Sequence, residues 1–374
     1  MAGRANMDGE KVAAQVAVIA HVMRECSDEQ QGVDAARQLR AISLPHRQDE
    51  DVRGIIGASE ALRAGLLHLL QTGSDTTQYW CCHCIVSISH KHFANQRAIA
   101  THPGMMEAIL KVLLHGCPLS KGAACSALVE STFRNEPNAL LVAKTPGMMH
   151  GVVAVMQSSA GDIKDDAAGV LRNCSNYSSE ATEVIVRSPG VLHALIEMCK
   201  GEHKSDRFTA MGTIQNLTRC SAVVPILTDA GVLEALIPAL NAFGLGEQHD
   251  VMRAEALMAV TNLSSESTCR GLESDPSVLS ILTQMVQCAV RGEAWRDVAW
   301  YDAEECITPM CRLSLNAANR AQFRKAGVML VLGELLATWL DTQKRLLPEG
   351  IDEWERTRAC HRAAGGEDVQ MATE

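Results

Sequence analysis

Apolar residues recur in a helical stripe at regular intervals along the chain. After Gly231 the sequence Val-Leu-Glu-Ala-Leu-Ile places apolar residues at i, i+1, i+4 and i+5, which predicts one face of an α-helix. A glycine opens a similar stripe at four other places, and degenerate copies carry Glu60 and Ser277 in the glycine position. Aligned on that position, the copies are spaced by 41 to 50 residues, at positions 60, 104, 147, 190, 231, 277 and 327.

A second pattern keeps step with the first and predicts a longer helix in each repeat. Each copy ends in Asn-Leu-Ser or a variant, and its central position comes 15 or 17 residues before the next glycine position. These central positions are Ser87, Glu130, Asn173, Asn216, Asn262 and Arg312. Glycine accepts the positive φ of a sharp corner, and proline ends a preceding helix. Each repeat is therefore predicted to contain a short first helix, a turn, a second helix, a loop and a third helix.

The phrases Gly-Val-Leu-x-Ala-Leu-Ile and Ala-x-x-Ala-x-x-Asn-Leu-Ser, clearest between Ser221 and Ser264, closely resemble the armadillo repeat. The resemblance implies an all-α, right-handed superhelical solenoid of six full repeats. Half-repeats would cap it, one at Lys11–Glu25 with Gln30–Ser43 and one at Asn316–Leu340. HEAT repeats are the alternative, but they usually lack the short first helix and the glycine hinge. We expect a flexible N-terminus (1–10), a solenoid (11–340) and a polar, partly disordered C-terminal extension (341–374).

The resemblance implies that the third helices line a concave groove, which the Asn position faces. In the importin alpha type of groove, a Trp four residues before the Asn forms a pocket for a lysine of a nuclear-localisation peptide. None of the corresponding positions holds Trp here; they are His83, Ser126, Gly169, Gly212, Met258 and Thr308. Only Asn173, Asn216 and Asn262 keep the Asn, so classical import signals are not expected to bind. These Asn side chains are predicted either to contact a peptide or to bond to backbone within the stack.

Acidic residues share the helix face of the Asn position. Asp166, Glu255 and Glu305 stand seven residues before it, and Glu130 occupies it. A partner segment with basic residues would complement this face. Because acids seven residues before the Asn fall in the first turn of the third helix, they can equally stabilise the helix dipole. The candidate groove residues are Asn173, Asn216, Asn262, Glu130, Asp166, Glu255, Glu305 and Arg312.

The longest spacing between repeats predicts a long loop over 288–302 that contains Trp295, Trp300 and Tyr301. Aromatic side chains exposed on a loop would serve as anchors for a partner. Alternatively, the loop folds back as a plug over the last repeats, and the sequence leaves both interpretations open.

The densest chemical cluster is Cys81-Cys82-His83-Cys84. Zinc sites need tetrahedral ligands, usually two separated pairs, whereas neighbours on a helix point about 100° apart. With no second Cys-x-x-Cys pair, we expect small buried residues here, no metal and no cofactor; a metal or redox site at 81–84 is the alternative. The chain also lacks a phosphate loop, a nucleophile elbow, a His-Glu-x-x-His motif and a dinucleotide fingerprint, so we expect no enzymatic activity.

Composition narrows the partners and the compartment. A formal net charge of -10 disfavours nucleic acid, because binding to phosphates needs clustered Lys and Arg. The cysteines fall mostly in apolar helical segments, and the polar opening at 1–10 does not resemble a secretion signal, which indicates a reducing compartment, the cytoplasm or the nucleus. The longest apolar run, 326–340, contains Glu334 and is too short to cross a bilayer, so direct membrane insertion is not expected.

These patterns favour a non-enzymatic scaffold that binds an extended segment of a partner protein in the concave groove. The alternative is an adaptor subunit of a membrane-tethering or ubiquitin-ligase assembly. The sequence contains no lipidation motif at Met1-Ala2-Gly3 and no U-box segment, so an adaptor would reach such an assembly through a partner.

Overall fold

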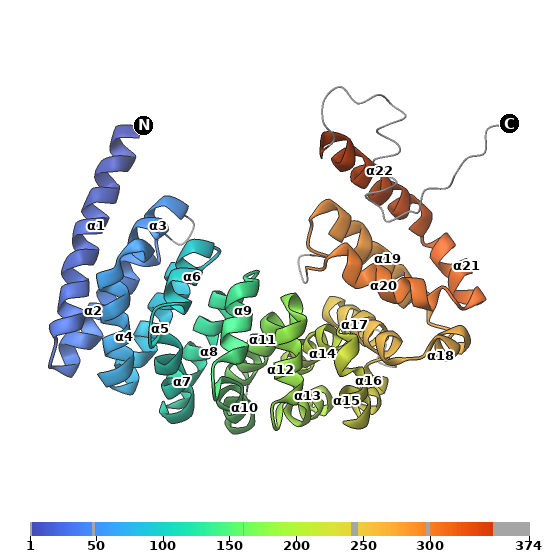
Figure 1. Cartoon of the computed structure of the whole chain (residues 1–374), viewed down its shortest axis with the longest axis horizontal. Helices are drawn as coiled ribbons and strands as arrows, with labels where there is room; N and C mark the ends of the chain where they lie inside the picture. Colours follow the sequence, from blue (N-terminus) through green and yellow to red (C-terminus); the bar gives the residue numbers. More distant parts are fainter. Residues whose placement is uncertain (1, 47–48, 160, 241–245, 297–299, 347–374) are drawn as a thin grey trace, which may run out of the picture. The chain divides into compact units, whose positions relative to one another are not determined.

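The computed structural model describes residues 2–46, 49–159, 161–240, 246–296 and 300–346, and gives only the backbone of 2–8, 177 and 338–346. Within these ranges every regular element is a helix, from α1 to α22, and none is a strand (Figure 1). The chain forms two compact bodies, the N-terminal body Met1–Ser264 and the C-terminal body Ser265–Glu374. The three-helix repeat runs through both, which confirms the all-helical repeat fold predicted from the sequence.

The helices fall into three classes by their place in the repeat. The first helices are α3 (Glu50–Ala58), α6 (Phe93–Ala100), α9 (Glu136–Lys144), α12 (Ser179–Arg187), α15 (Val224–Asp229, preceded by the 3-10 turn Ser221–Val223), α18 (Glu266–Gly271) and α21 (Ala317–Lys325). The second helices are α1 (Ala2–Glu25), α4 (Glu60–Thr72), α7 (Met105–His115), α10 (Met148–Ser158), α13 (Val191–Lys200), α16 (Val232–Leu240), α19 (Pro276–Arg291) and α22 (Val328–Leu346). The third helices are α2 (Glu29–Ser43), α5 (Asp75–Ser89), α8 (Pro118–Thr132), α11 (Asp162–Tyr177), α14 (Lys204–Thr218), α17 (Glu247–Leu263) and α20 (Ala303–Leu313).

The predicted extents differ from the structure in two places. Helix α1 begins at Ala2, within the segment 1–10 that was predicted to be flexible, and α22 continues past residue 340 to Leu346. The remainder of the predicted C-terminal extension, 347–374, lies outside the described residues. Half-repeats flank the six full repeats as predicted: α1 and α2 form the first, and α21 and α22 form the second.

A left-handed glycine makes the corner between the first and second helices of most repeats. The glycines at positions 104, 147, 190, 231 and 327 have φ between +77° and +86°, a conformation that other L-residues adopt only with strain. At two of these corners the helices meet at 84° (α9 and α10) and 87° (the segment Ser221–Asp229 and α16). Where the glycine is missing, an extended cap replaces it, since the Ser59 hydroxyl accepts from the Leu62 N–H and the Asp275 carboxylate from the Ser277 N–H.

The core of the N-terminal body is densest between its third helices. Neighbours in the series α2, α5, α8, α11, α14 and α17 contact one another extensively, whereas neighbouring second helices after α4 touch much less. Small residues allow this close approach: Ala123, Ala124, Cys125 and Ala127 on α8 are almost fully buried. A stack whose members pack more closely along one row curves towards that row, so the third helices line the inner side of the curve.

Polar side chains of the first helices join neighbouring repeats. Asn138 on α9 donates to the Ser131 carbonyl at the end of α8 (2.8 Å), and Asn95 on α6 donates to the Ile88 carbonyl at the end of α5 (3.0 Å). Asn319 on α21 repeats the contact with the Leu313 carbonyl (3.1 Å). The last carbonyls of a helix have no partner within the helix, so these amides stabilise the ends of α5, α8 and α20.

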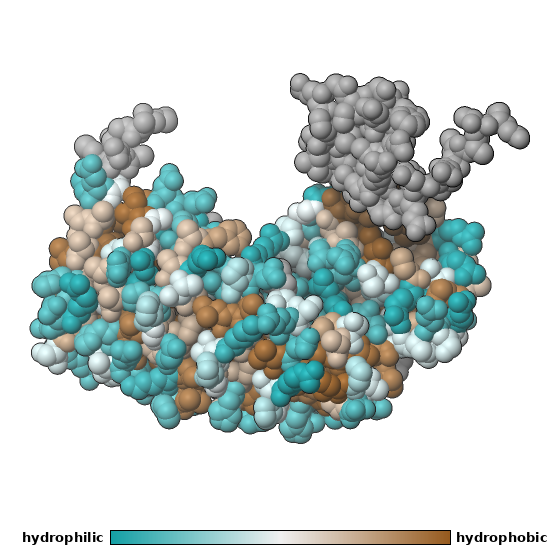
Figure 2. Space-filling model, viewed as in Figure 1, coloured by the Kyte–Doolittle hydropathy of each residue, from teal (hydrophilic) through white to brown (hydrophobic). Residues whose placement is uncertain are grey.

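The visible surface is mainly polar. Figure 2 shows hydrophilic residues over most of the face in view, with hydrophobic patches between them, among others over α13 and α16. Ile237 on α16, for example, is 47% exposed. Apolar side chains scattered in this way are ordinary for a water-facing surface.

The left-handed corner can be tested with Gly190→Ala. A Cβ at Gly190 would lie 3.2 Å from a Val153 methyl group on a backbone with φ of +82°, so we expect a loss of about 1–2 kcal/mol in the free energy of unfolding. Gly333→Ala within α22, where nothing lies within 4 Å of the added Cβ, should instead be neutral or stabilising by up to about 1 kcal/mol. Urea denaturation followed by circular dichroism measures both variants. Equal effects would show that the corner conformation does not matter.

Candidate functional site

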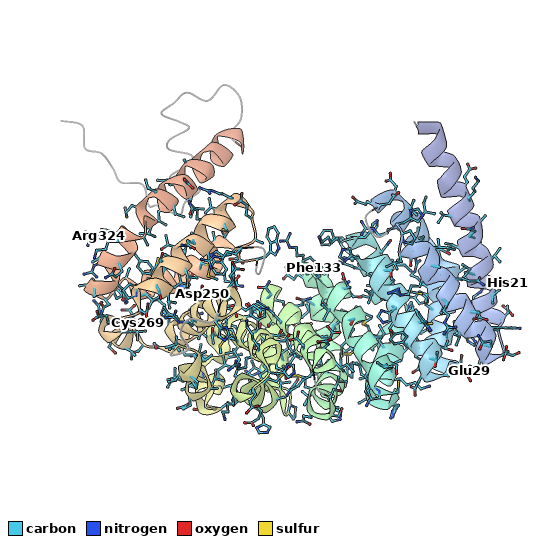
Figure 3. All side chains as sticks on the ribbon, turned by 180° about the vertical axis from the view of Figure 1, so that it is seen from behind. His21, Glu29, Phe133, Asp250, Cys269 and Arg324 are labelled. Atoms are coloured by element: carbon cyan, nitrogen blue, oxygen red, sulfur yellow. The ribbon has the colours of Figure 1, made fainter. Side chains whose placement is uncertain are left out.

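The inner side of the N-terminal body presents a continuous row of partly exposed side chains, which we call the third-helix face. It consists of residues of α5, α8, α11 and α14 that are neither fully buried nor on the outside of the stack. They include Tyr79, Trp80, His83, Val86, Ser126, Val129, Glu130, Asp166, Gly169, Arg172, Asn173, Asn176 and Phe208, and Arg219 follows directly after α14. Phe133, directly after α8, is also half-buried, and the guanidinium carbon of Arg134 lies 5.6 Å from its ring centroid (Figure 3).

The three Asn side chains predicted to face a peptide each donate a hydrogen bond to the preceding repeat. Asn173 Nδ2 donates to the Val129 carbonyl (3.0 Å), and Asn216 Nδ2 donates to the Arg172 carbonyl (3.1 Å). Asn262 Nδ2 donates to the Thr218 hydroxyl (3.2 Å). Asn173 and Asn262 remain half-buried, whereas Asn216 is only 5% exposed. The Asn row thus holds neighbouring repeats in register, and a ligand would meet mainly its first and last members.

An ion pair links two third helices that are not neighbours. Arg172 on α11 reaches over α14 to the Glu255 carboxylate on α17, with Nη2 and Oε1 2.9 Å apart. Its guanidinium lies over Gly212, where an added Cβ would be 2.6 Å from Cζ, and 5.2 Å from the Phe208 ring centroid. Glu255 is fully buried, and Arg172 neutralises its charge within the stack. Glu255 could contact a basic residue of a partner segment, as predicted, only if Arg172 moved away.

The other predicted acids also have contacts within the protein. Glu130 Oε1 lies 3.0 Å from His90 Nδ1 of the preceding repeat. Asp166 accepts a hydrogen bond from the Ser126 hydroxyl, and burial raises the pKa of the Asp166 carboxyl. In the C-terminal body, Glu305 forms a reciprocal capping box with Asp302 at the start of α20, which agrees with the helix-stabilising interpretation. Arg312 is half-buried in the last turn of α20.

A group of cations and rings that the sequence did not identify lies at the N-terminal end of the face. The guanidinium carbons of Arg37 and Arg40 on α2 lie 5.3 and 5.8 Å from the Trp80 ring centroid on α5. Tyr79 packs edge-on against both Trp80 (5.2 Å) and His83 (4.4 Å). The half-repeat lacks the Asn-Leu-Ser phrase, so α2 was not aligned with the other third helices. The spacing of 43 residues between Arg37 and Trp80, one period, was the signal that could have revealed the contact.

The predicted loop over 288–302 begins later than expected. Cys288 belongs to α19, which continues to Arg291 and ends at Gly292, a residue with φ of +68°. The prediction was wrong because Met285, Val286 and Cys288 extend the helical stripe by one more turn. Trp295 is only 2% exposed, with the Arg296 guanidinium 4.5 Å from its ring, whereas Trp300 is 55% exposed and Tyr301 half-buried. The loop therefore has one buried and one exposed indole.

The Cys81–Cys84 segment forms part of the core. Cys81, Cys82 and Cys84 are fully buried, and Cys84 Sγ donates to the Ala36 carbonyl (3.1 Å). Burial raises the pKa of Cys82 to about 12, so its thiol is protonated at neutral pH. Among the residues that the structure describes, no three His, Cys, Asp or Glu side chains gather in a way that could hold a metal ion. In the same ranges, no single helix is long and apolar enough to cross a membrane.

Comparison with known proteins yields matches among solved structures. No family model matches the chain, and no curated protein matches it. A crystal structure of an engineered protein is 19% identical, has a TM-score of 0.58, and aligns over 66% of this chain and 96% of its own. A designed armadillo repeat protein is 16% identical with a TM-score of 0.57, over 68% of this chain and 99% of its own. Another, in complex with the peptide (KR)4, is 16% identical with a TM-score of 0.56, over 67% and 98%. At these identities the likeness establishes the fold alone, an armadillo-type α-solenoid.

The Arg172 bridge can be tested with Gly212→Ala. The added methyl group would displace the guanidinium and weaken its contact with buried Glu255, so we expect a loss of about 1–3 kcal/mol in unfolding free energy. The matched control is Gly169→Ala, at the same place in α11, whose Cβ would meet only a Val129 methyl group at 3.4 Å. That variant should be neutral or stabilising by up to about 1 kcal/mol. If both changes have the same effect in urea denaturation, the contact between Arg172 and Glu255 does not require the space that the missing side chain of Gly212 leaves.

The half-buried carboxyl of Asp166 predicts an unusual dependence of stability on pH. Because its folded-state pKa is raised, the ionised form destabilises the fold at neutral pH, and this cost disappears as the pH falls through the raised pKa. Asp166→Asn should therefore be stabilising at pH 7, by less than about 1 kcal/mol, and the gain should shrink towards pH 4. Asp162→Asn, at an exposed carboxylate in the first turn of α11, should lose a few tenths of a kcal/mol or less at pH 7. A gain for Asp166→Asn that does not change between pH 7 and pH 4 would contradict the account.

Proposed function

We propose that this armadillo-type stack is a non-enzymatic scaffold that binds an extended segment of a partner protein along its third-helix face. The observation that carries the proposal is the row itself, in which α5, α8 and α11 each present half-buried side chains at equivalent positions. Packed helices lie about 8–10 Å apart, which corresponds to roughly three residues of extended chain. An extended peptide can therefore meet the same kind of position on each successive repeat.

The character of the exposed positions also supports a peptide ligand. Val86 and Val129 occupy equivalent places on α5 and α8 and provide apolar contact, while the Asn173 amide and the Ser126 hydroxyl lie nearby as polar groups on the same face. A few polar groups among apolar ones are typical of recognition surfaces. Among proteins with this fold, one solved structure concerns designed armadillo repeat proteins for modular peptide recognition, and another contains a (KR)4 peptide.

The contacts of the acidic residues weaken the prediction that the partner segment is basic along its whole length. A basic segment was expected from the acidic positions, but Glu130 and Glu255 lie against His90 and Arg172 within the stack. Asp166 is the acid on the face that is half-buried beside a hydroxyl rather than a cation. We propose that a basic residue, where the partner has one, is bound beside Asp166 in the middle of the face.

We further propose that the protein works in the cytoplasm or the nucleus. Buried thiols outside disulfide bonds suit a reducing compartment, and the cysteines in the described ranges form no disulfide bond. Neither nucleic-acid binding nor membrane insertion is part of this proposal, because the charge balance and the helices favour neither. An adaptor role would use the same face, with the partner linking the scaffold to its assembly.

Selection from a peptide display library, followed by fluorescence anisotropy with the selected peptides, tests the proposal. Val129→Gln replaces an apolar contact on the third-helix face with an amide and should weaken binding by roughly fivefold or more, equivalent to about 1 kcal/mol. The matched control is Ile237→Gln on α16, an exposed apolar residue of a second helix, which should change affinity less than about twofold.

Urea denaturation of both variants separates loss of binding from loss of folding. If the selected peptides bind equally well to the wild type and to Val129→Gln but lose affinity for Ile237→Gln, the binding site lies on the second helices instead of the third-helix face. Failure to select any peptide above background would overturn the proposal.

A further inference from the structure

The N-terminal end of the third-helix face differs in charge from the rest of the face. Arg37 and Arg40 on α2, together with Tyr79, Trp80 and His83 on α5, form a compact group that we call the Arg–Trp cluster. Elsewhere on the face two acids lie beside basic side chains: Glu255 pairs with Arg172, and Glu130 lies beside His90. In the Arg–Trp cluster the cations lie against an aromatic ring instead.

Both guanidinium groups lie near the Trp80 ring, and this contact does not use their hydrogen-bonding capacity. The guanidinium carbons lie 5.3 and 5.8 Å from the ring centroid, within the range of a cation–π contact. A guanidinium stacked on a ring still has its N–H donors at the edges, in the fork that matches two oxygens of a carboxylate or a phosphate. Two such donor groups thus lie within cation–π distance of the Trp80 ring.

The helices that carry the cluster are held in place by buried contacts. Cys84 Sγ, one turn after Trp80 on α5, donates to the Ala36 carbonyl on α2 at 3.1 Å. Ala36 and Leu39 on α2 are themselves fully buried. Because α2 is fixed against α5, the two arginines extend from a backbone that is already in place, which reduces the conformational entropy lost on binding.

The charges of the cluster are incompletely neutralised within the protein. Arg37 lies 4.0 Å from the Asp34 carboxylate on the same helix, and both side chains are 51% exposed, so this pair is weak. The buried Nε of Arg40 has no hydrogen-bond partner within the described residues. Burial and the charge of Arg40 lower the pKa of His83, which agrees with a positive potential at this end of the face.

We propose that the Arg–Trp cluster binds an anionic side chain of the partner segment, either the carboxylate of Asp or Glu or a phosphate ester. This inference rests on the proposed function, since the anion belongs to a peptide that lies along the third-helix face. The partner segment is then polarised: an acidic residue lies over α2 and α5, and the remainder continues towards α11.

The test uses the full chain and four fluorescein-labelled octapeptides with amidated C-termini: (Glu-Gly)4, (phosphoserine-Gly)4, (Gln-Gly)4 and (Lys-Gly)4. The variant is Arg37→Gln with Arg40→Gln. The control, Arg97→Gln with Arg187→Gln, removes the same charge from exposed positions on the first helices α6 and α12. We expect at least one anionic peptide to bind more tightly than its Gln counterpart. Its affinity should fall by roughly fivefold or more in the cluster variant and by less than about twofold in the control. The peptide that shows the larger loss identifies the anion.

The inference is overturned if neither anionic peptide binds, or if the cluster variant and the control lose affinity equally, which would indicate a general effect of net charge. Val129→Gln separates this failure from that of the proposed function. If a peptide depends on Val129 and not on the two arginines, the face binds peptides and the cluster is not part of the site. If it depends on the arginines and not on Val129, the cluster binds anions and the extended groove is wrong.

Discussion

The sharp corner between the first and second helices of the repeat, 84° and 87° at two places, is the constraint on which the rest of the structure depends. Five of these corners use a glycine with φ near +80°, which allows the chain to turn without a loop. The turn brings the apolar faces of the helices together, and the third helix then closes the repeat. Glu60 and Ser277 replace the glycine in two repeats. There the side chain of the preceding Ser59 or the nearby Asp275 caps the start of the second helix, so the corner can form either with a glycine or with a side-chain cap.

Close packing of the third helices turns this repeating corner into a surface. Alanine, cysteine and glycine let α5, α8, α11 and α14 approach one another, and the side chains left on the inner side meet those of the next repeat. Many of their polar groups are consequently engaged inside the stack, as Asn173 is with Val129 and Arg172 with Glu255. The face is rigid for that reason, and its capacity for a ligand lies in the groups that remain half-exposed. At one end of the face, the guanidinium groups of the Arg–Trp cluster lie against the Trp80 ring.

Local sequence predicted the repeat well and predicted the face only in part. Glycine corners and the Asn-Leu-Ser ends depend on neighbouring residues, so their period could be read directly and all six full repeats and both half-repeats were identified. Partners across the stack depend on packing. The ion pair between Arg172 and Glu255 joins residues that are 83 positions apart, and it requires the absence of a side chain at Gly212. No local sequence pattern predicts such a contact. Cys288 was misassigned to a loop because a helical stripe does not indicate by itself where a helix ends.

The central claim is that ligands bind to the third helices rather than to the outer rows or to the loop after α19. Hydrogen–deuterium exchange of the chain, with and without a saturating bound peptide, tests this claim most directly. The account predicts that added protection is concentrated in α5, α8 and α11, while α7, α10 and α13 exchange as they do in the free protein. Protection confined to the second helices, or to the residues around Trp300, would contradict it.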